Sequence, residues 1–156
     1  MPDSRDEIHK ASERLLADRR AMDEFNQAVI KEFRASGGKV AGQMKGMPVL
    51  LLTTTGAKSG RALTRPLVYT RDGERIVIVA SYGGNDHNPP WYHNLLANPR
   101  ATVEIDSDKF TAEASVTSGD ERRTLFERHA QRMPIFADYQ EKTRRQIPVL
   151  VLKRVA

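Results

Sequence analysis

The chain has 156 residues, of which 39% are hydrophobic and 29% charged, and this composition predicts one folded domain with a buried core. It contains no cysteine, which excludes disulfide bonds, thiolate catalysis and thiolate metal sites. The formal net charge is +5, and the excess is local, because residues 33–71 contain seven basic side chains and no acidic one. Such a patch attracts anions, whether nucleic-acid backbone, lipid headgroups or a phosphorylated small molecule.

The chain begins with the polar, acidic stretch MPDSRDE, and no apolar run approaches the roughly 20 residues that span a bilayer. We therefore expect neither a secretory signal nor a transmembrane helix, and a cytoplasmic protein. Apolar residues at helical spacing from Ile8 to Phe33 predict one long amphipathic helix. A capping box at Ser4 and Glu7 opens this helix, and Gly37-Gly38 ends it.

The next segments predict strands. MPVLLLTTT is a short, apolar and β-branched run, typical of a buried strand. PLVYTRDGERIVIVASYGG contains two strand-like runs around Asp72-Gly73, which is a strong hairpin signal. We expect a single domain over residues 1–156, with a helical extension at 1–45 and a core at 46–156.

The second half continues with short elements. NPPWYHNLLANP predicts a short helix with an asparagine cap, Asn88, and a proline at its first position. ATVEIDSDKFTAEASVTS is a second hairpin, and a capping box at Ser118 and Glu121 opens a helix through about Arg132. IPVLVLKRV is the last strand. About six strands, mostly in hairpins and with helices between them, indicate an α+β domain around an antiparallel sheet or small barrel.

The turn Gly56-Ala57-Lys58-Ser59-Gly60 lies inside the acid-free segment. It lacks the spacing of a phosphate-binding loop and of a nucleophile elbow. Its backbone N–H groups, the Ser59 hydroxyl and the Lys58 ammonium can nevertheless converge on one anion, with Arg61 and Arg65 available for bidentate contacts. An ordinary solvated hairpin with basic side chains is an equally supported interpretation.

The four histidines, His9, His87, His93 and His129, do not have the spacing of a zinc site, so we predict no metal and expect surface or helix-capping roles. Asp86 and His87 lack a defined third partner for a hydrolytic triad. The stretch SYGGNDHNPPWYHNL is more informative, because a strand runs directly into Gly83-Gly84 and then into a helix with the single tryptophan. Its backbone can approach a planar ligand closely, with Trp91 and Tyr92 as apolar walls, although Trp91 as a core anchor is the simpler alternative.

Four stretches, in this order, resemble the deazaflavin (F420)-dependent nitroreductase and quinone reductase family: FNQAVIKEFRASGGKV, LLLTTTGAKSGRALTRPLVY, RDGERIVIVASYGGNDHNPPWYHNLLANPRATVEI and DYQEKTRRQIPVLVL. The resemblance covers nearly all of the chain after about residue 22. It implies an FMN-binding-like split β-barrel and the coenzyme F420, an 8-hydroxy-5-deazaflavin, without a metal. The implied activity is hydride transfer from reduced F420 to a quinone or a related conjugated acceptor, such as a nitro compound or an enone.

The resemblance also implies site residues. For the phosphate and acidic tail of the coenzyme these are Thr55, Gly56, Lys58, Ser59, Gly60, Arg61, Arg65 and Pro66, and for its ring they are Ser81, Tyr82, Gly83, Gly84, Pro90 and Trp91. Ser81 and Tyr139 are the candidate catalytic donors, and the substrate pocket would include Met133, Phe136 and Tyr139. Leu63 stands where family members commonly carry an arginine, which leaves Arg61 or Arg65 for that anion.

Other functions remain open. The main alternative is a non-catalytic split-barrel protein that binds a deazaflavin, a flavin or a lipid-like molecule. Nucleic-acid binding is disfavoured, because only 6% of the residues are aromatic and the strand before the basic turn is buried in character. We expect the N-terminal helix to pack on the barrel, with peripheral membrane contact as its alternative use. A monomer and a homodimer are both compatible with the sequence.

Overall fold

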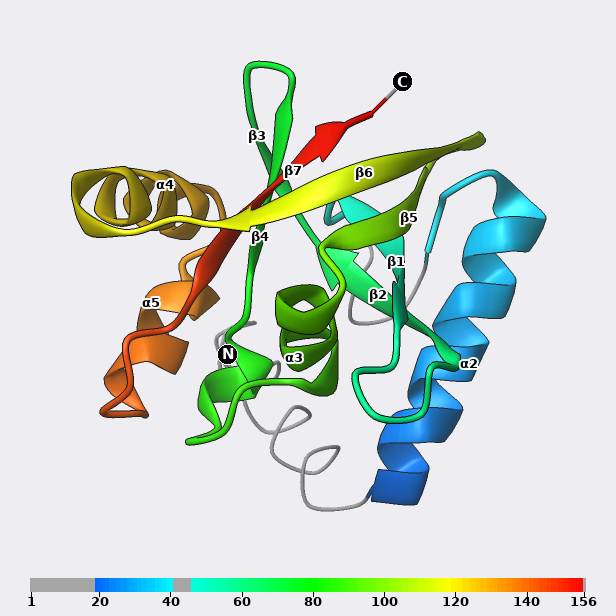
Figure 1. Ribbon diagram of the computed structural model, residues 1–156, viewed down its shortest axis with the longest axis horizontal. Coiled ribbons are helices and arrows are strands. Elements are labelled where there is room, and N and C mark those ends of the chain that lie inside the picture. The colour runs from blue at the N-terminus through cyan, green and yellow to red at the C-terminus, as the bar shows by residue number, and fades with distance from the viewer. Residues whose placement is uncertain (1–18, 41–45, 156) are drawn as a thin grey trace, which may run out of the picture.

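The computed structural model describes residues 19–40 and 46–155. Within this part of the chain, seven strands form one antiparallel sheet in the order β2-β1-β5-β6-β7-β4-β3. The strands are β1 (Val49–Thr55), β2 (Ala62–Val68), β3 (Thr70–Asp72), β4 (Arg75–Val79), β5 (Arg100–Ile105), β6 (Asp108–Val116) and β7 (Val149–Arg154). The sheet is strongly curled (Figure 1), and the predicted α+β split β-barrel is confirmed.

The helices lie at three places around this sheet. They are α2 (Arg19–Ser36), the short 3-10 helix η2 (Tyr82–Gly84), α3 (Pro90–Ala97), α4 (Gly119–Arg132) and α5 (Ile135–Glu141). Helix α2 lies on one side of the sheet, α4 and α5 lie on the opposite side, and α3 lies between them below the strands in the view of Figure 1. None of the helices in the described ranges is long and apolar enough to cross a membrane.

The curl of the sheet encloses the main core. The inward residues of the strands, such as Leu50, Leu52 and Ile78, pack there with Trp91 and Leu95 of α3. Side chains alternate between the two faces of a strand, so the neighbours of these residues point outward. The outward residues of β1 pack under α2, and those of β4 and β7 pack under α4 and α5. Continuous apolar runs such as VLLL are therefore buried on both faces.

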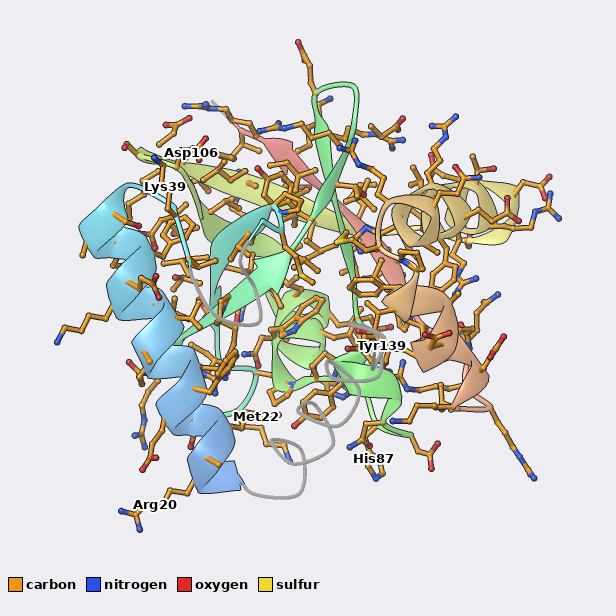
Figure 2. All side chains as sticks on the ribbon, turned by 180° about the vertical axis from the view of Figure 1, so that it is seen from behind. Arg20, Met22, Lys39, His87, Asp106 and Tyr139 are labelled. Atoms are coloured by element: carbon orange, nitrogen blue, oxygen red, sulfur yellow. The ribbon has the colours of Figure 1, made fainter. Side chains whose placement is uncertain are left out.

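Helix α2 is attached at its C-terminal end. Arg34 makes a bidentate ion pair with Glu104 of β5, at 3.2 and 3.0 Å. Gly38 has φ +102, and a Cβ on it would lie 2.5 Å from the Asp106 Cα, so only glycine permits this approach. Lys39 and Asp106 accordingly lie together at this end of the helix (Figure 2). The predicted end of the helix before Gly37-Gly38 is confirmed, whereas its predicted start, with the Ser4 and Glu7 capping box, lies outside the described residues.

Two elements differ from the prediction. The run that begins at Pro66 is divided between two strands, because residues up to Val68 pair with β1 and Thr70–Asp72 pair with β4. The change of partner occurs at Tyr69, whose N–H donates to the Pro48 carbonyl at 3.0 Å. This division raises the strand count from about six to seven. Helix α5 was not predicted, because its seven residues are too few to display helical periodicity.

Both predicted helix caps need correction at the level of the side chain. The first residue of α3 is a proline as expected, but Pro89 and not Asn88 occupies the cap position. Helix α4 does follow Ser118, yet the Ser118 side chain makes no capping hydrogen bond, and Glu121 pairs with Arg75 at 3.4 Å instead. The Asn88 side chain accepts a hydrogen bond from Arg145 instead of capping α3. In both cases a residue distant in sequence has replaced the expected local partner.

Candidate active site

The predicted turn Gly56–Gly60 lies in the connection between β1 and β2, and residues 55–61 are here termed the anion turn. The Gly56 N–H donates to the Arg61 carbonyl at 2.8 Å, and the Gly60 N–H donates to the Gly56 carbonyl at 3.0 Å. The Ser59 hydroxyl accepts the Arg61 N–H at 3.2 Å, so its own proton remains available for a ligand. Lys58, Ser59 and Arg61 are exposed, and a Cβ built on Gly60 would meet nothing within 4 Å. The turn therefore presents donors and positive charge to an open space.

A buried asparagine of α3 holds this turn in place. The Asn94 amide donates to the Thr54 hydroxyl at 3.0 Å, and its carbonyl oxygen accepts the Ala57 N–H at 2.9 Å. Trp91 and Leu95 of the same helix are buried in the main core. The turn, the helix and the barrel interior are thus one connected unit.

The ring loop (residues 80–88) leaves β4 at the other side of α3. Ser81, only 7% exposed, precedes three residues of positive φ, namely Tyr82 (+48), Gly83 (+64) and Gly84 (+81). The Ser81 side chain makes no capping hydrogen bond to the 3-10 helix that follows it. A Cβ on Gly84 would lie 2.9 Å from the Tyr139 carbonyl oxygen, so this glycine brings α5 against the loop. A non-glycine residue at positive φ is strained, and such strain is typical of functional loops.

The segment that follows α5, here termed the clamp segment (residues 142–147), runs along the ring loop. Its Thr143 hydroxyl donates to the Asp86 carboxylate at 3.0 Å, and Arg145 donates to several acceptors of the loop. Burial lowers the pKa of the Arg145 guanidinium, and the nearby Asp86 carboxylate acts in the opposite direction. An arginine at this position stays charged at neutral pH, because a guanidinium loses its proton only far above that pH.

The three residues predicted for the substrate pocket belong to one buried cluster. Met133 is 8% exposed, Phe136 6% and Tyr139 7%, and all three pack with the outward residues of β4 and β7. Phe136 packs edge-on against Tyr139, with ring centroids 5.6 Å apart. Of the three, Tyr139 is the residue that adjoins the ring loop (Figure 2). The role of this cluster as a substrate wall stays a prediction.

The remaining predicted coenzyme-binding residues lie on β2 and α3, and not all of them face the candidate site. Pro66 lies opposite Leu51 in the β1–β2 register, so it faces the side that α2 covers and not the anion turn. Arg65 occupies the next register position, on the other face of the strand, but its long side chain reaches α2. Its Nη1 donates to the Thr64 carbonyl at 2.9 Å, and its Nη2 lies 3.8 Å from the Asp23 carboxylate. Trp91 is 4% exposed in the main core, as the core-anchor alternative expects. Pro90 is exposed at the start of α3.

The histidines separate into two kinds. His87 and His93 are exposed, and Figure 2 shows His87 pointing away from the molecule, whereas His9 lies outside the described residues. The expectation of a surface or capping role is wrong for His129, which is fully buried between β3 and α5. Its Nδ1 lies 2.9 Å from the Thr70 hydroxyl, and burial lowers its pKa to about 4. Among the residues that the structure describes, no group of acidic and histidine side chains could hold a metal ion.

Sequence reasoning missed two residues of this region. Asn94 carried a detectable signal, because it lies three positions after Trp91 and therefore on the buried face of a short helix. Arg145 carried none, since it follows Arg144 in a charged stretch and nothing local distinguishes the two.

The model of one protein family, described as F420H(2)-dependent quinone reductase, matches residues 26–154. The chain belongs to the F420H(2)-dependent quinone reductase family. An F420H(2)-dependent quinone reductase of Mycobacterium tuberculosis (strain H37Rv) is 37% identical over 129 residues, which cover 78% of this chain and 85% of that protein. The comparisons confirm the predicted family and the predicted class of enzyme, an F420-dependent oxidoreductase. They also confirm quinone reduction as the main predicted activity.

Solved structures support the same conclusion about the quinone reductase fold. An F420-H2-dependent reductase has 36% sequence identity and a TM-score of 0.63, covering 68% of this chain and 94% of that one. A second structure, described as a domain-swapped dimer, has the same identity and TM-score, with 68% and 80% of the two chains covered.

The donors of this family member fit a coenzyme that carries a phosphate and an acidic tail. The anion turn lies within residues 33–71, a segment that contains seven basic residues and no acidic one. A Cβ built on Gly60 of this turn would meet nothing within 4 Å. The ring loop adds Ser81, which is 7% exposed and whose side chain makes no helix-capping hydrogen bond. Cationic and N–H donors are the groups that bind phosphate oxygens.

Proposed function

We propose that this protein catalyses the two-electron reduction of a quinone, or of a related planar conjugated acceptor, by reduced F420. One observation carries the proposal beyond the family. The anion turn and the ring loop flank the same helix, α3, which is bonded to the turn through Asn94 and follows directly on the loop (Figure 1). A ligand with an anionic tail and a flat ring can contact both.

The anion turn would hold the phosphate and acidic tail. Lys58 and Arg61 supply charge from exposed positions, and the Ser59 hydroxyl supplies a neutral donor. Between the two arginines considered for the Leu63 position, Arg61 is the better candidate. Arg65 is already engaged with the Thr64 carbonyl and lies near Asp23.

The ring loop would hold the deazaflavin. When bound, the reduced coenzyme supplies the hydride. The chain contributes position and charge stabilisation. The Ser81 hydroxyl is not used to cap the helix that follows it, and Tyr139 adjoins the same loop. A hydroxyl that donates to the acceptor oxygen as it gains negative charge would stabilise the transition state more than the ground state.

The decisive experiment combines binding and turnover. Purified protein is titrated with oxidised F420, FMN and NADPH while Trp91 fluorescence is followed, and consumption of reduced F420 is then measured with menadione as the acceptor. We expect saturable quenching by F420 alone, together with turnover. Binding without turnover would favour the non-catalytic alternative, and no binding would refute the proposal.

Two sets of variants test the residue roles. Lys58→Ala should weaken F420 binding about tenfold, because a charge-assisted contact to phosphate is lost. Lys39→Ala is the matched control, since Lys39 belongs to the same basic segment but lies at the far end of α2 (Figure 2). Ser81→Ala combined with Tyr139→Phe should lower kcat with little change in F420 affinity. Unchanged turnover in the double variant would contradict these two assignments.

Assembly is a separate proposal. A structure 36% identical to this chain is described as a domain-swapped dimer, which supports a homodimer here. Sedimentation equilibrium at micromolar concentration measures the mass directly, and a monomer under those conditions would contradict it.

A further inference from the structure

Arg145 of the clamp segment bonds the ring loop at four points. Its Nε donates to the Asn85 carbonyl, and its Nη2 donates to the Ser81 carbonyl, both at 2.8 Å. Its Nη1 donates to the Asn88 side-chain oxygen at 2.9 Å and to the Ala80 carbonyl at 3.2 Å. The loop from its first residue to its last is therefore gathered around one half-buried guanidinium.

The conformation of the ring loop needs such support. Tyr82, Gly83 and Gly84 have positive φ in succession, which is unfavourable for the tyrosine. Two backbone bonds close the turn within the loop, from Gly84 N–H to the Ser81 carbonyl at 2.9 Å and from Asn85 N–H to the Tyr82 carbonyl at 3.1 Å. Strained backbone persists only where the surrounding contacts over-determine it. The bonds from Arg145 lie on both sides of the strained residues.

The backbone of the clamp segment is hydrogen-bonded to side chains of α4 and α5. The Gln140 amide donates to the Arg145 carbonyl at 2.8 Å, and its oxygen accepts the Ile147 N–H at 3.0 Å. Arg122 of α4 is buried and donates to that same Gln140 oxygen at 3.0 Å. Arg122 also donates twice to the Ile147 carbonyl, at 2.7 and 3.1 Å. The backbone that carries Arg145 is thus bonded to two helices, α4 and α5.

The geometry requires an arginine and not simply a cation. The guanidinium presents its donors in a rigid, planar fork, and here Nε, Nη1 and Nη2 are each directed to different acceptors. A lysine ammonium is a single compact centre with three donors and cannot span the same positions. The neighbouring Arg144 is exposed and makes none of these bonds.

We propose that Arg145 is a positioning residue that holds the ring loop in the conformation that receives the deazaflavin, with Gln140 and Arg122 holding the backbone of Arg145. This inference rests on the proposed function for the identity of the ligand. The arrangement pre-organises the loop before the coenzyme arrives. Without it, only a fraction of molecules would have a binding-competent loop, and the apparent dissociation constant would rise in inverse proportion to that fraction.

The test compares wild-type protein with Arg145→Lys, Arg145→Ala and the control Arg144→Ala. In the absence of coenzyme, hydrogen–deuterium exchange of residues 80–88 should be at least tenfold faster in both Arg145 variants and unchanged in Arg144→Ala. The dissociation constant for oxidised F420, followed by Trp91 fluorescence, should rise about tenfold in Arg145→Lys. Low-millimolar guanidinium should restore part of the affinity of Arg145→Ala, because it can occupy the vacated position. A residue that only stabilised the global fold would not show this rescue.

The outcomes separate the two proposals. Absence of F420 binding by the wild-type protein would refute the proposed function, and this inference with it. Equal F420 affinity and equal exchange of residues 80–88 in wild-type and Arg145→Lys protein would refute the inference alone. If Arg145→Lys does not fold, Asn88→Ala decides the question, because it removes one acceptor from a half-buried position. An increase of about fivefold in the dissociation constant is then expected, and an unchanged constant overturns the inference.

Discussion

Replacement of Asn94 by leucine tests the connection between α3 and the anion turn. The substitution keeps a side chain of similar size but removes both hydrogen bonds, to the Thr54 hydroxyl and from the Ala57 N–H. Ala57 is exposed, so water can replace its partner, whereas Thr54 is 2% exposed and its hydroxyl loses a buried partner. The loss of two hydrogen bonds, together with one buried hydroxyl left without a partner, should lower the free energy of unfolding by about 2 to 3 kcal/mol.

Urea denaturation followed by the fluorescence of Trp91 measures this loss, since Trp91 lies on the same helix. His93→Ala is the matched control, because His93 is exposed on α3 and its removal should change the free energy of unfolding by less than about 0.5 kcal/mol. The double variant Thr54→Val/Asn94→Leu should recover at least about 1 kcal/mol relative to Asn94→Leu, because replacing both polar partners by apolar groups removes the unsatisfied hydroxyl.

The same double variant separates stability from function. Asn94→Leu should weaken F420 binding, because the Ala57 N–H of the anion turn loses its partner. The double variant removes the unsatisfied hydroxyl but does not restore this bond, so its F420 affinity should be as weak as that of Asn94→Leu while its stability recovers. A free energy of unfolding for Asn94→Leu within about 0.5 kcal/mol of wild type would refute the reasoning, because the buried amide would then contribute nothing measurable.

Two further predictions concern buried positions near the site. The pKa of His129 is about 4 in the folded protein and 6.5 when unfolded, so below pH 6.5 the unfolded chain takes up a proton that the folded chain does not. The free energy of unfolding should fall by about 3 kcal/mol as the pH decreases from 6.5 to 4. Urea midpoints measured across this range should show the fall, and in His129→Leu most of this pH dependence should be absent. Gly84→Ala should be at least about 1 kcal/mol more destabilising than Gly73→Ala, because both glycines have positive φ but only Gly84 has a backbone atom within 3 Å of the added Cβ. Equal decreases in melting temperature for the two alanine variants would contradict this prediction, because the backbone of α5 would then accommodate the added Cβ without loss of stability.

The local patterns of the chain were sufficient for most of the fold. Apolar runs such as MPVLLLTTT, and the Asp-Gly and Ser-Asp turn signals between alternating segments, depend on contacts between neighbours in sequence. The antiparallel hairpins and the end of α2 at Gly37 follow from them. The basic, acid-free segment is equally a property of composition, and it predicts the anion turn without tertiary information. Family membership could be inferred as well, because the order of the motifs is preserved along the chain.

Tertiary structure decided which side chains meet in and around the candidate site, because their partners lie far away in sequence. Arg144 and Arg145 are chemically identical neighbours, yet only Arg145 points beneath a loop some sixty positions earlier in the chain. Pro66 and Arg65 are adjacent, but the register of β1 with β2 turns them to opposite faces of the sheet. His129 is buried because α4 packs its inner face on the sheet. Pro89 and not Asn88 has the cap position of α3, and the Asn88 side chain accepts a hydrogen bond from Arg145 of the clamp segment. Sequence spacing predicts periodicity and charge, whereas burial and hydrogen-bond partners depend on which distant segments the closed fold brings into contact.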